Sequence, residues 1–171
     1  QQPWNISPSD NTGGNKRTED IIRMLDKYEL DTVIYTDGSC KAGIDEGGSA
    51  AIITTGSARN PVVLETIQKR GSKYTSSFQE EKAAMWLALE WMKEHQYGDT
   101  IICSDSQSLL RALETQSPDT IDMRTALDNM RGFTHLHWVP GHTNVPGNEI
   151  ADKAAKAATA RAEQQSPISF N

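Results

Sequence analysis

The order of the predicted strands and helices indicates an α/β fold built on a mixed sheet. Three strand-like segments come first, joined by connections short enough for an antiparallel meander, and two further strands then alternate with helices. The 171 residues suffice for one domain with a buried core. We therefore expect one sheet of five strands, three antiparallel and then two parallel, flanked by helices.

Residues 1–30 are predicted to form an N-terminal extension. Pro, Gly, Ser and Asn dominate residues 1–18, which have almost no apolar periodicity, as is typical of a linker. Further along, Ile22 and Leu25 recur at helical spacing, which predicts a short helix that docks on the core. The folded domain is expected to span residues 31–163.

The first half of that domain contains three strands and a long helix. β-branched residues between turns containing Gly or Asn predict strands over 32–37, 47–54 and 62–69. Residues 76–95 are rich in Ala, Leu, Met and Glu and open with serines that can cap a helix. Because apolar residues occur nearly all round this helix, we expect it to be covered on more than one side.

The second half alternates strands with helices. The predicted elements are a buried strand over 100–104, helices over 106–114 and 119–131, a strand over 134–139 and an Ala-rich helix over 148–162. Pro140 and Gly141 stop the last strand. Residues 164–171 are predicted to form a disordered tail.

Charge and composition limit the function classes. A net charge of -6 weighs against a nucleic-acid binder, but four metal-holding carboxylates would account for most of it, since discounting them leaves -2. No apolar run approaches the roughly 20 residues of a membrane span, and no secretory leader is visible. We expect an intracellular protein, nuclear or cytoplasmic and not secreted, with Cys40 and Cys103 as reduced thiols.

Polar residues follow three of the predicted strands. Asp37 and Asp105 come at strand ends, and His142 lies two residues past Pro140. Ligands of α/β sheets bind beyond the carboxyl ends of parallel strands. If the three strands are neighbours and parallel, two carboxylates and an imidazole converge on one spot.

Each candidate also fits an ordinary structural role. Asp37 in the sequence DGS fits a turn, Asp105 fits a helix cap, and His142 fits a solvated loop. Glu81 fits a first-turn acid and Asp152 a surface charge on a helix. Taken singly, none of the five identifies a function.

Taken in order, the motifs resemble the type I ribonuclease H family over about residues 32–162. The matching segments are YTDGSC at 35–40, the acid that opens SSFQEEKAAMWLALEWMKEH, CSDSQS at 103–108 and GHTNVPGNEIADKAAKAA at 141–158. Four weak motifs in the same order, each on the expected strand end or helix, make a chance match improbable. The resemblance implies a ribonuclease H-like fold and a Mg²⁺-dependent endonuclease that cuts the RNA strand of an RNA–DNA hybrid.

The resemblance also implies the active site. The family's metal-binding carboxylates correspond to Asp37, Glu81, Asp105 and Asp152. Helical periodicity does not separate Glu80 from Glu81, and alignment of the helix to the family favours Glu81. Such a cluster makes sense only around cations, and two Mg²⁺ ions about 4 Å apart, or Mn²⁺ in their place, support in-line hydrolysis that leaves 5′-phosphate and 3′-hydroxyl ends.

The remaining site residues follow from the same resemblance. His142 matches a mobile catalytic histidine that assists without holding metal. Residues expected to contact the hybrid are Gly38, Ser39, Ser76, Ser77 and Gln107. Selectivity for RNA would come from contacts to successive 2′-hydroxyls in the minor groove.

One departure from the bacterial enzymes points to a subfamily. The interval between Asp105 and His142 lacks the extra basic helix and loop that the bacterial stand-alone enzymes carry there. Its only basic residues are Arg111, Arg124 and Arg131. The motifs FQEE, WVPGH and VPGNEIADKAA, preceded by QPW, resemble the ribonuclease H domain of non-LTR retrotransposon polyproteins. A neighbouring reverse transcriptase domain would then hold the hybrid, with no membrane involved.

Two rival hypotheses remain at this point. One is another nuclease or recombinase of the same fold, against which the HTNVPGNEIAD segment counts. The other is a catalytically weak or inactive ribonuclease H module that serves as a connector or nucleic-acid-binding domain. Loss of a carboxylate would be its sign, and all four are present.

Overall fold

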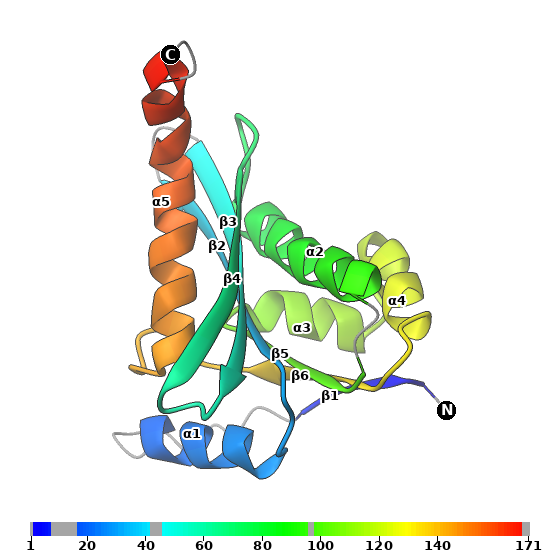
Figure 1. The fold of residues 1–171 in the computed structure, drawn as a ribbon. Coiled ribbons are helices and arrows are strands. Elements are labelled where there is room, and N and C mark those ends of the chain that lie inside the picture. The colour runs from blue at the N-terminus through cyan, green and yellow to red at the C-terminus, as the bar shows by residue number, and fades with distance from the viewer. Residues whose placement is uncertain (1, 8–16, 42–45, 96–97, 169–171) are drawn as a thin grey trace.

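A mixed sheet forms the centre of the protein, as the computed structural model shows for residues 2–7, 17–41, 46–95 and 98–168 (Figure 1). Its strand order is β1-β6-β5-β2-β3-β4. The strands are β1 (Trp4–Ile6), β2 (Val33–Lys41), β3 (Glu46–Gly56), β4 (Pro61–Arg70), β5 (Thr100–Ser104) and β6 (Thr134–Trp138). β2, β3 and β4 are antiparallel, whereas β5 is parallel to β2 and β6 to β5. This confirms the predicted meander and the two parallel strands, to which β1 adds a sixth strand.

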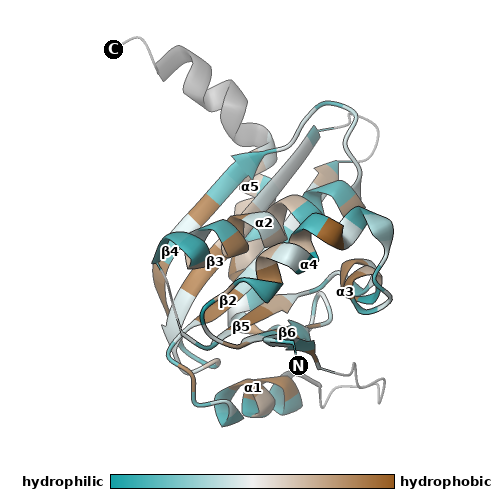
Figure 2. Cartoon of the chain, turned by 90° about the vertical axis from the view of Figure 1, so that its right-hand side faces the viewer, coloured by the Kyte–Doolittle hydropathy of each residue, from teal (hydrophilic) through white to brown (hydrophobic). Residues whose placement is uncertain are grey.

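Helices cover both faces of this sheet. They are α1 (Arg17–Lys27), α2 (Ser77–His95), α3 (Gln107–Glu114), α4 (Ile121–Asp128) and α5 (Pro146–Ile168), with a short 3-10 helix at Pro118–Thr120. α2, α3 and α4 lie on one face, and α5 lies on the other with α1 at its end (Figure 1). Each face therefore has its own apolar core, one around Met85 and Leu109 and the other around Tyr35 and Val145. α1 and α2 carry both hydrophobic and hydrophilic segments, as helices between a core and water do (Figure 2).

The N-terminal extension belongs to the fold. β1, which lies within the expected linker, pairs in parallel with β6 and places the buried Trp4 against α4, where its indole Nε1 donates to Asp128 Oδ1 at 2.8 Å. The predicted short helix corresponds to α1, which buries Ile21, Ile22 and Leu25. A strand of three residues is too short to show periodicity, so its pairing with the edge of β6 decides its structure.

Several element boundaries differ from the prediction, and the ends of β2 and α5 differ most. β2 does not end at Asp37 but continues to Lys41, because β3 extends equally far and pairs with it throughout. α5 continues to Ile168, past its expected end and into the expected disordered tail, whereas residues 169–171 lie outside the described residues. In the described part of the chain, no helix is both long and apolar enough to cross a membrane.

Candidate active site

Two aspartates meet where the parallel part of the sheet ends. Thr36 of β2 and Ser104 of β5 form the last parallel pair, and Asp37 and Asp105 each follow directly. The two residues therefore lie side by side at the carboxyl end of β5. Asp37 does so from inside a strand rather than from the predicted turn.

A glycine lets the third carboxylate reach this point. A Cβ on Gly38 would lie only 2.5 Å from the backbone nitrogen of Glu81, so the first turn of α2 rests directly on β2. The Gly38 N–H donates to Glu81 Oε1 at 2.9 Å. Glu80 faces elsewhere: it is buried and accepts a hydrogen bond from the hydroxyl of Thr75. The structure thus brings Glu81, and not Glu80, to the aspartates.

The fourth carboxylate comes from α5. Gly147 packs on the ring of Tyr35, where a side chain would collide, and this contact brings the start of α5 close to β2. Asp152, one and a half turns further on, interacts with Asp37. Its Oδ2 also accepts from Lys156 Nζ at 3.0 Å, and its side chain is 29% exposed, which makes it the outer member of the cluster.

The inner three carboxylates form a set that fits a metal ion. Oxygen atoms of Asp37, Glu81 and Asp105 all lie within 4.8 Å of one another. Asp105 Oδ1 is buried and has no hydrogen-bond partner, although buried polar atoms are normally paired. Carboxylate oxygens are the ligands that hard divalent cations prefer. A divalent cation would satisfy Asp105 Oδ1 and offset the repulsion among the three groups.

Burial and mutual repulsion shift the pKa values of this cluster upward. Burial, then the neighbouring Asp105 and Asp152, raise the pKa of Asp37 to about 9. Burial, then Asp105 and Asp37, raise the pKa of Glu81 to about 10. Burial also raises the pKa of Asp105. Without metal, the folded protein therefore holds protons on this cluster at neutral pH.

These pKa shifts predict a pH-dependent stabilisation by Mg²⁺. A carboxyl whose pKa rises on folding stabilises the protein below its unfolded value near 4. That contribution is lost as pH rises toward the folded value, about 9 for Asp37. We therefore expect added Mg²⁺ to raise the melting temperature more at pH 8 than at pH 5, where protons compete with the metal.

Thermal unfolding at both pH values with and without Mg²⁺ checks this expectation. Asp122→Asn is a matched control, because Asp122 is an exposed acid on α4 outside the cluster. Its response to Mg²⁺ should equal that of the parent. An identical shift at pH 5 and pH 8 in the parent would contradict a metal site at the cluster.

His142 lies in the loop that runs past this cluster. The loop joins β6 to α5, and a Cβ on Gly141 would lie 3.4 Å from Asp105 Oδ2. His142 is exposed and has a φ of 61°, a left-handed backbone conformation. Thr143 fixes the loop, since its hydroxyl donates to the Pro140 carbonyl at 2.7 Å and its carbonyl accepts from the Thr18 hydroxyl.

The expected substrate-contacting residues lie in β2 and at the starts of α2 and α3. Ser39 is half-buried in β2, and the exposed Ser76 caps α2 by accepting from the Gln79 N–H at 3.2 Å. The exposed Ser77 and the partly exposed Gln107 are the first residues of α2 and α3. Gly38 differs from the others, because its N–H is already engaged by Glu81.

Sequence reasoning did not single out three residues that support the site. Lys156 forms an ion pair with Asp152, and the i, i+4 spacing of the two residues on a helix could have predicted this pair. The Trp138 indole Nε1 donates to the Asp105 carbonyl at 3.3 Å, and Thr18 holds the histidine loop. Nothing local marks these last two contacts, because each joins segments distant in sequence.

Comparisons with known proteins agree on one family. A family model described as RNase H matches residues 29–160. The chain is 30% identical over 140 residues to the ribonuclease H of Polynucleobacter asymbioticus, which covers 72% of this chain and 86% of that protein.

Solved structures show the same fold. LC11-RNase H1 in complex with an RNA/DNA hybrid has a TM-score of 0.61 at 18% identity, over 77% of this chain and 99% of that one. The foamy viral protease-reverse transcriptase in complex with dsDNA has a TM-score of 0.63 at 17% identity, over 78% of this chain and 96% of that one.

Proposed function

Because the chain belongs to the ribonuclease H family, we propose that it hydrolyses the RNA strand of RNA–DNA hybrids inside the cell and leaves 5′-phosphate and 3′-hydroxyl ends. The observation that carries this proposal is the set of three carboxylates at the carboxyl end of β5, of which Asp37 is buried, Glu81 and Asp105 are partly buried, and one oxygen of Asp105 is buried without a partner. A close set of carboxylates of this kind has no evident structural use without cations.

We assign metal binding to the four carboxylates. Asp37, Glu81 and Asp105 would hold the inner part of a site for two Mg²⁺ ions, and Asp152 would complete it from α5. Mn²⁺, which also accepts oxygen ligands, would substitute. When bound, such ions supply Lewis-acid activation of water and stabilise a departing 3′ oxygen. The Gly38 N–H orients Glu81 for this role.

The residues around the cluster would orient the hybrid. Ser39, Ser76 and Ser77 offer small hydroxyl groups near the first turn of α2, whereas Gly38, which we also expect near the hybrid, is packed against that turn. Gln107 would reach the minor groove from the start of α3. Contacts to 2′-hydroxyls would give selectivity for RNA, and contacts to the backbone would leave little sequence preference.

The test is a cleavage assay with labelled duplexes. We expect cutting of the RNA strand of an RNA–DNA hybrid in Mg²⁺ and no cutting after chelation. Preferential cutting of double-stranded RNA or double-stranded DNA would favour another nuclease of this fold. Hybrid binding without cleavage would favour a connector or binding module.

His142→Ala should slow turnover markedly and leave measurable cleavage. An imidazole can pass protons near neutral pH, but hard cations do not require it as a ligand. His142 is exposed on its loop, so the change should not disturb the fold. Comparison of single-turnover with steady-state rates separates proton transfer from product release. A variant as inactive as Asp37→Asn would contradict an auxiliary role.

We further propose that the domain works beside a reverse transcriptase, as the motifs FQEE, WVPGH and VPGNEIADKAA suggest. The similar fold within a viral protease-reverse transcriptase is consistent with this. Arg124 donates to Thr120 Oγ1 at 3.1 Å and to two carbonyl oxygens. Few basic groups between Asp105 and His142 are therefore left to bind phosphates.

The domain alone should therefore lose activity steeply with added salt, because counterions displace weak phosphate contacts. Fusion to a nucleic-acid-binding domain should restore the activity. Nanomolar affinity of the domain alone for a hybrid at physiological salt would contradict this proposal.

A further inference from the structure

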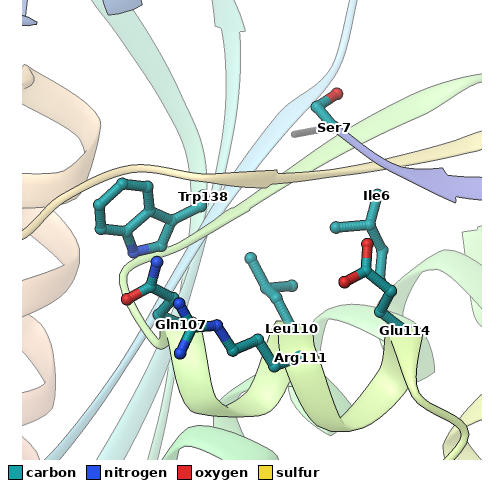
Figure 3. Close-up of a pocket in the computed structure, with 7 residues that line it drawn as sticks. All are labelled: Ile6, Ser7, Gln107, Leu110, Arg111, Glu114 and Trp138. Carbon is teal, nitrogen blue, oxygen red and sulfur yellow. The ribbon is translucent and has the colours of Figure 1, made fainter. Parts of the chain in front are cut away.

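A pocket of about 260 Å³ lies beside the carboxylate cluster, between β1, β6 and α3 (Figure 3). We call it the β1–α3 pocket. Its lining consists of Ile6, Ser7, Gln107, Leu110, Arg111, Glu114 and Trp138. The Trp138 indole donates to the carbonyl of Asp105, and Gln107 follows Asp105 by two residues. One end of the pocket therefore adjoins the cluster.

One face of α3 supplies the polar groups of this pocket. Gln107, Leu110, Arg111 and Glu114 follow the i, i+3, i+4, i+7 spacing of a single helix face. Figure 3 shows the guanidinium of Arg111 extending toward Trp138 and the carboxylate of Glu114 at the opposite end, near Ile6. Within the described part of the chain, the side chains of Arg111 and Glu114 make no ion pair, although their spacing allows one.

This combination of charges would suit a ribonucleotide better than a deoxyribonucleotide. A guanidinium pairs well with a phosphate. A carboxylate is negatively charged, so it repels phosphates. It only accepts hydrogen bonds, so its partner must be a donor. The DNA backbone offers no donor, whereas each RNA residue offers its 2′-hydroxyl. The apolar surfaces of Ile6 and Leu110 and the indole of Trp138 can contact the ribose or base.

We propose that the β1–α3 pocket binds one ribonucleotide of the RNA strand next to the scissile phosphate. Arg111 holds its phosphate, and Glu114 accepts a hydrogen bond from its 2′-hydroxyl. This inference rests on the proposed function and adds a specificity site to it. Ile6 and Ser7 precede the family match at residues 29–160, so the pocket depends on an element outside that match.

Steady-state kinetics on an RNA–DNA hybrid test the role of Arg111. Arg111→Gln should raise KM about tenfold, the loss expected from one charge-assisted hydrogen bond, and leave kcat within about twofold. Arg131→Gln is the matched control, because this exposed arginine lies at the opposite end of β6. It should leave KM within about twofold of the parent. Equal KM values for the two variants would overturn the proposal.

Hybrids with a single 2′-deoxy substitution test Glu114. For the parent, moving the substitution along the RNA strand should raise KM at each position whose 2′-hydroxyl is contacted, including one position beside the cut that Glu114 contacts. In Glu114→Ala, that one position should no longer matter while the others still do, because only the acceptor for its hydroxyl is gone. An unchanged positional profile in Glu114→Ala would overturn the assignment. A parent that cuts no hybrid would contradict the proposed function as well, whereas an active parent with unaffected variants contradicts the pocket alone.

Discussion

Asp37→Asn and Asp105→Asn should each abolish cleavage of the hybrid and leave the fold intact. Both residues belong to the set of three carboxylates whose oxygens lie within 4.8 Å of one another, and an amide cannot replace a charged ligand for a hard cation. We expect kcat to fall by at least about 1000-fold, which is the upper end of the loss observed when one preorganised electrostatic group is removed.

The same substitutions should stabilise the protein when no metal is bound. Each removes a carboxyl whose pKa is raised by burial and by its acidic neighbours. The free energy of unfolding at pH 8 should therefore rise by at least about 1.4 kcal/mol for Asp37→Asn, the equivalent of one pKa unit, and it should also rise for Asp105→Asn. Denaturant unfolding in a chelator measures this gain. Cleavage within about tenfold of the parent in either variant would refute the assignment of the active site.

Glu81→Gln should disable the enzyme, whereas Glu80→Gln should leave it nearly unchanged. Glu81 accepts the Gly38 N–H and reaches the aspartates, but Glu80 is buried beside Thr75 on the other side of the turn. We expect a loss of at least about 100-fold for Glu81→Gln. We expect a change within about threefold for Glu80→Gln, whose amide oxygen can still accept from Thr75.

The pair provides its own control, because the two substitutions are chemically identical and adjacent. Circular dichroism and melting curves verify that both variants fold. Titration with Mg²⁺ should show a weakened response for Glu81→Gln and a normal response for Glu80→Gln. If the two effects came out reversed, Glu80 and not Glu81 would be the metal ligand.

Short-range patterns were sufficient to predict most of the sheet and to single out the two strand-end aspartates. Apolar runs between turns marked β2 to β6, and Asp105 stands at the end of a continuous buried run. The order of four motifs then indicated which acids belong together. Placement of Glu81 depended on the family resemblance, because helical spacing alone left Glu80 equivalent.

Long-range pairing decided what the sequence could not show. Asp37 lies within β2 because β3 pairs with that strand as far as Lys41, and a DGS triplet gives no hint of this partner. β1 is a strand because the edge of β6 is available to it. The β1–α3 pocket depends on that pairing, so no inspection of local sequence would find it.

The pairing of β1 with β6 also has a consequence for folding. Trp4 contacts Asp128 across 124 residues of chain, and closure of a long loop carries an entropic cost. During synthesis β1 emerges before the other described strands, and its neighbour β6 emerges only after β2, β3, β4 and β5. We therefore expect this edge of the sheet to form last. A nascent chain that ends before Thr134 would leave Trp4 in water, with one wall of the β1–α3 pocket still missing.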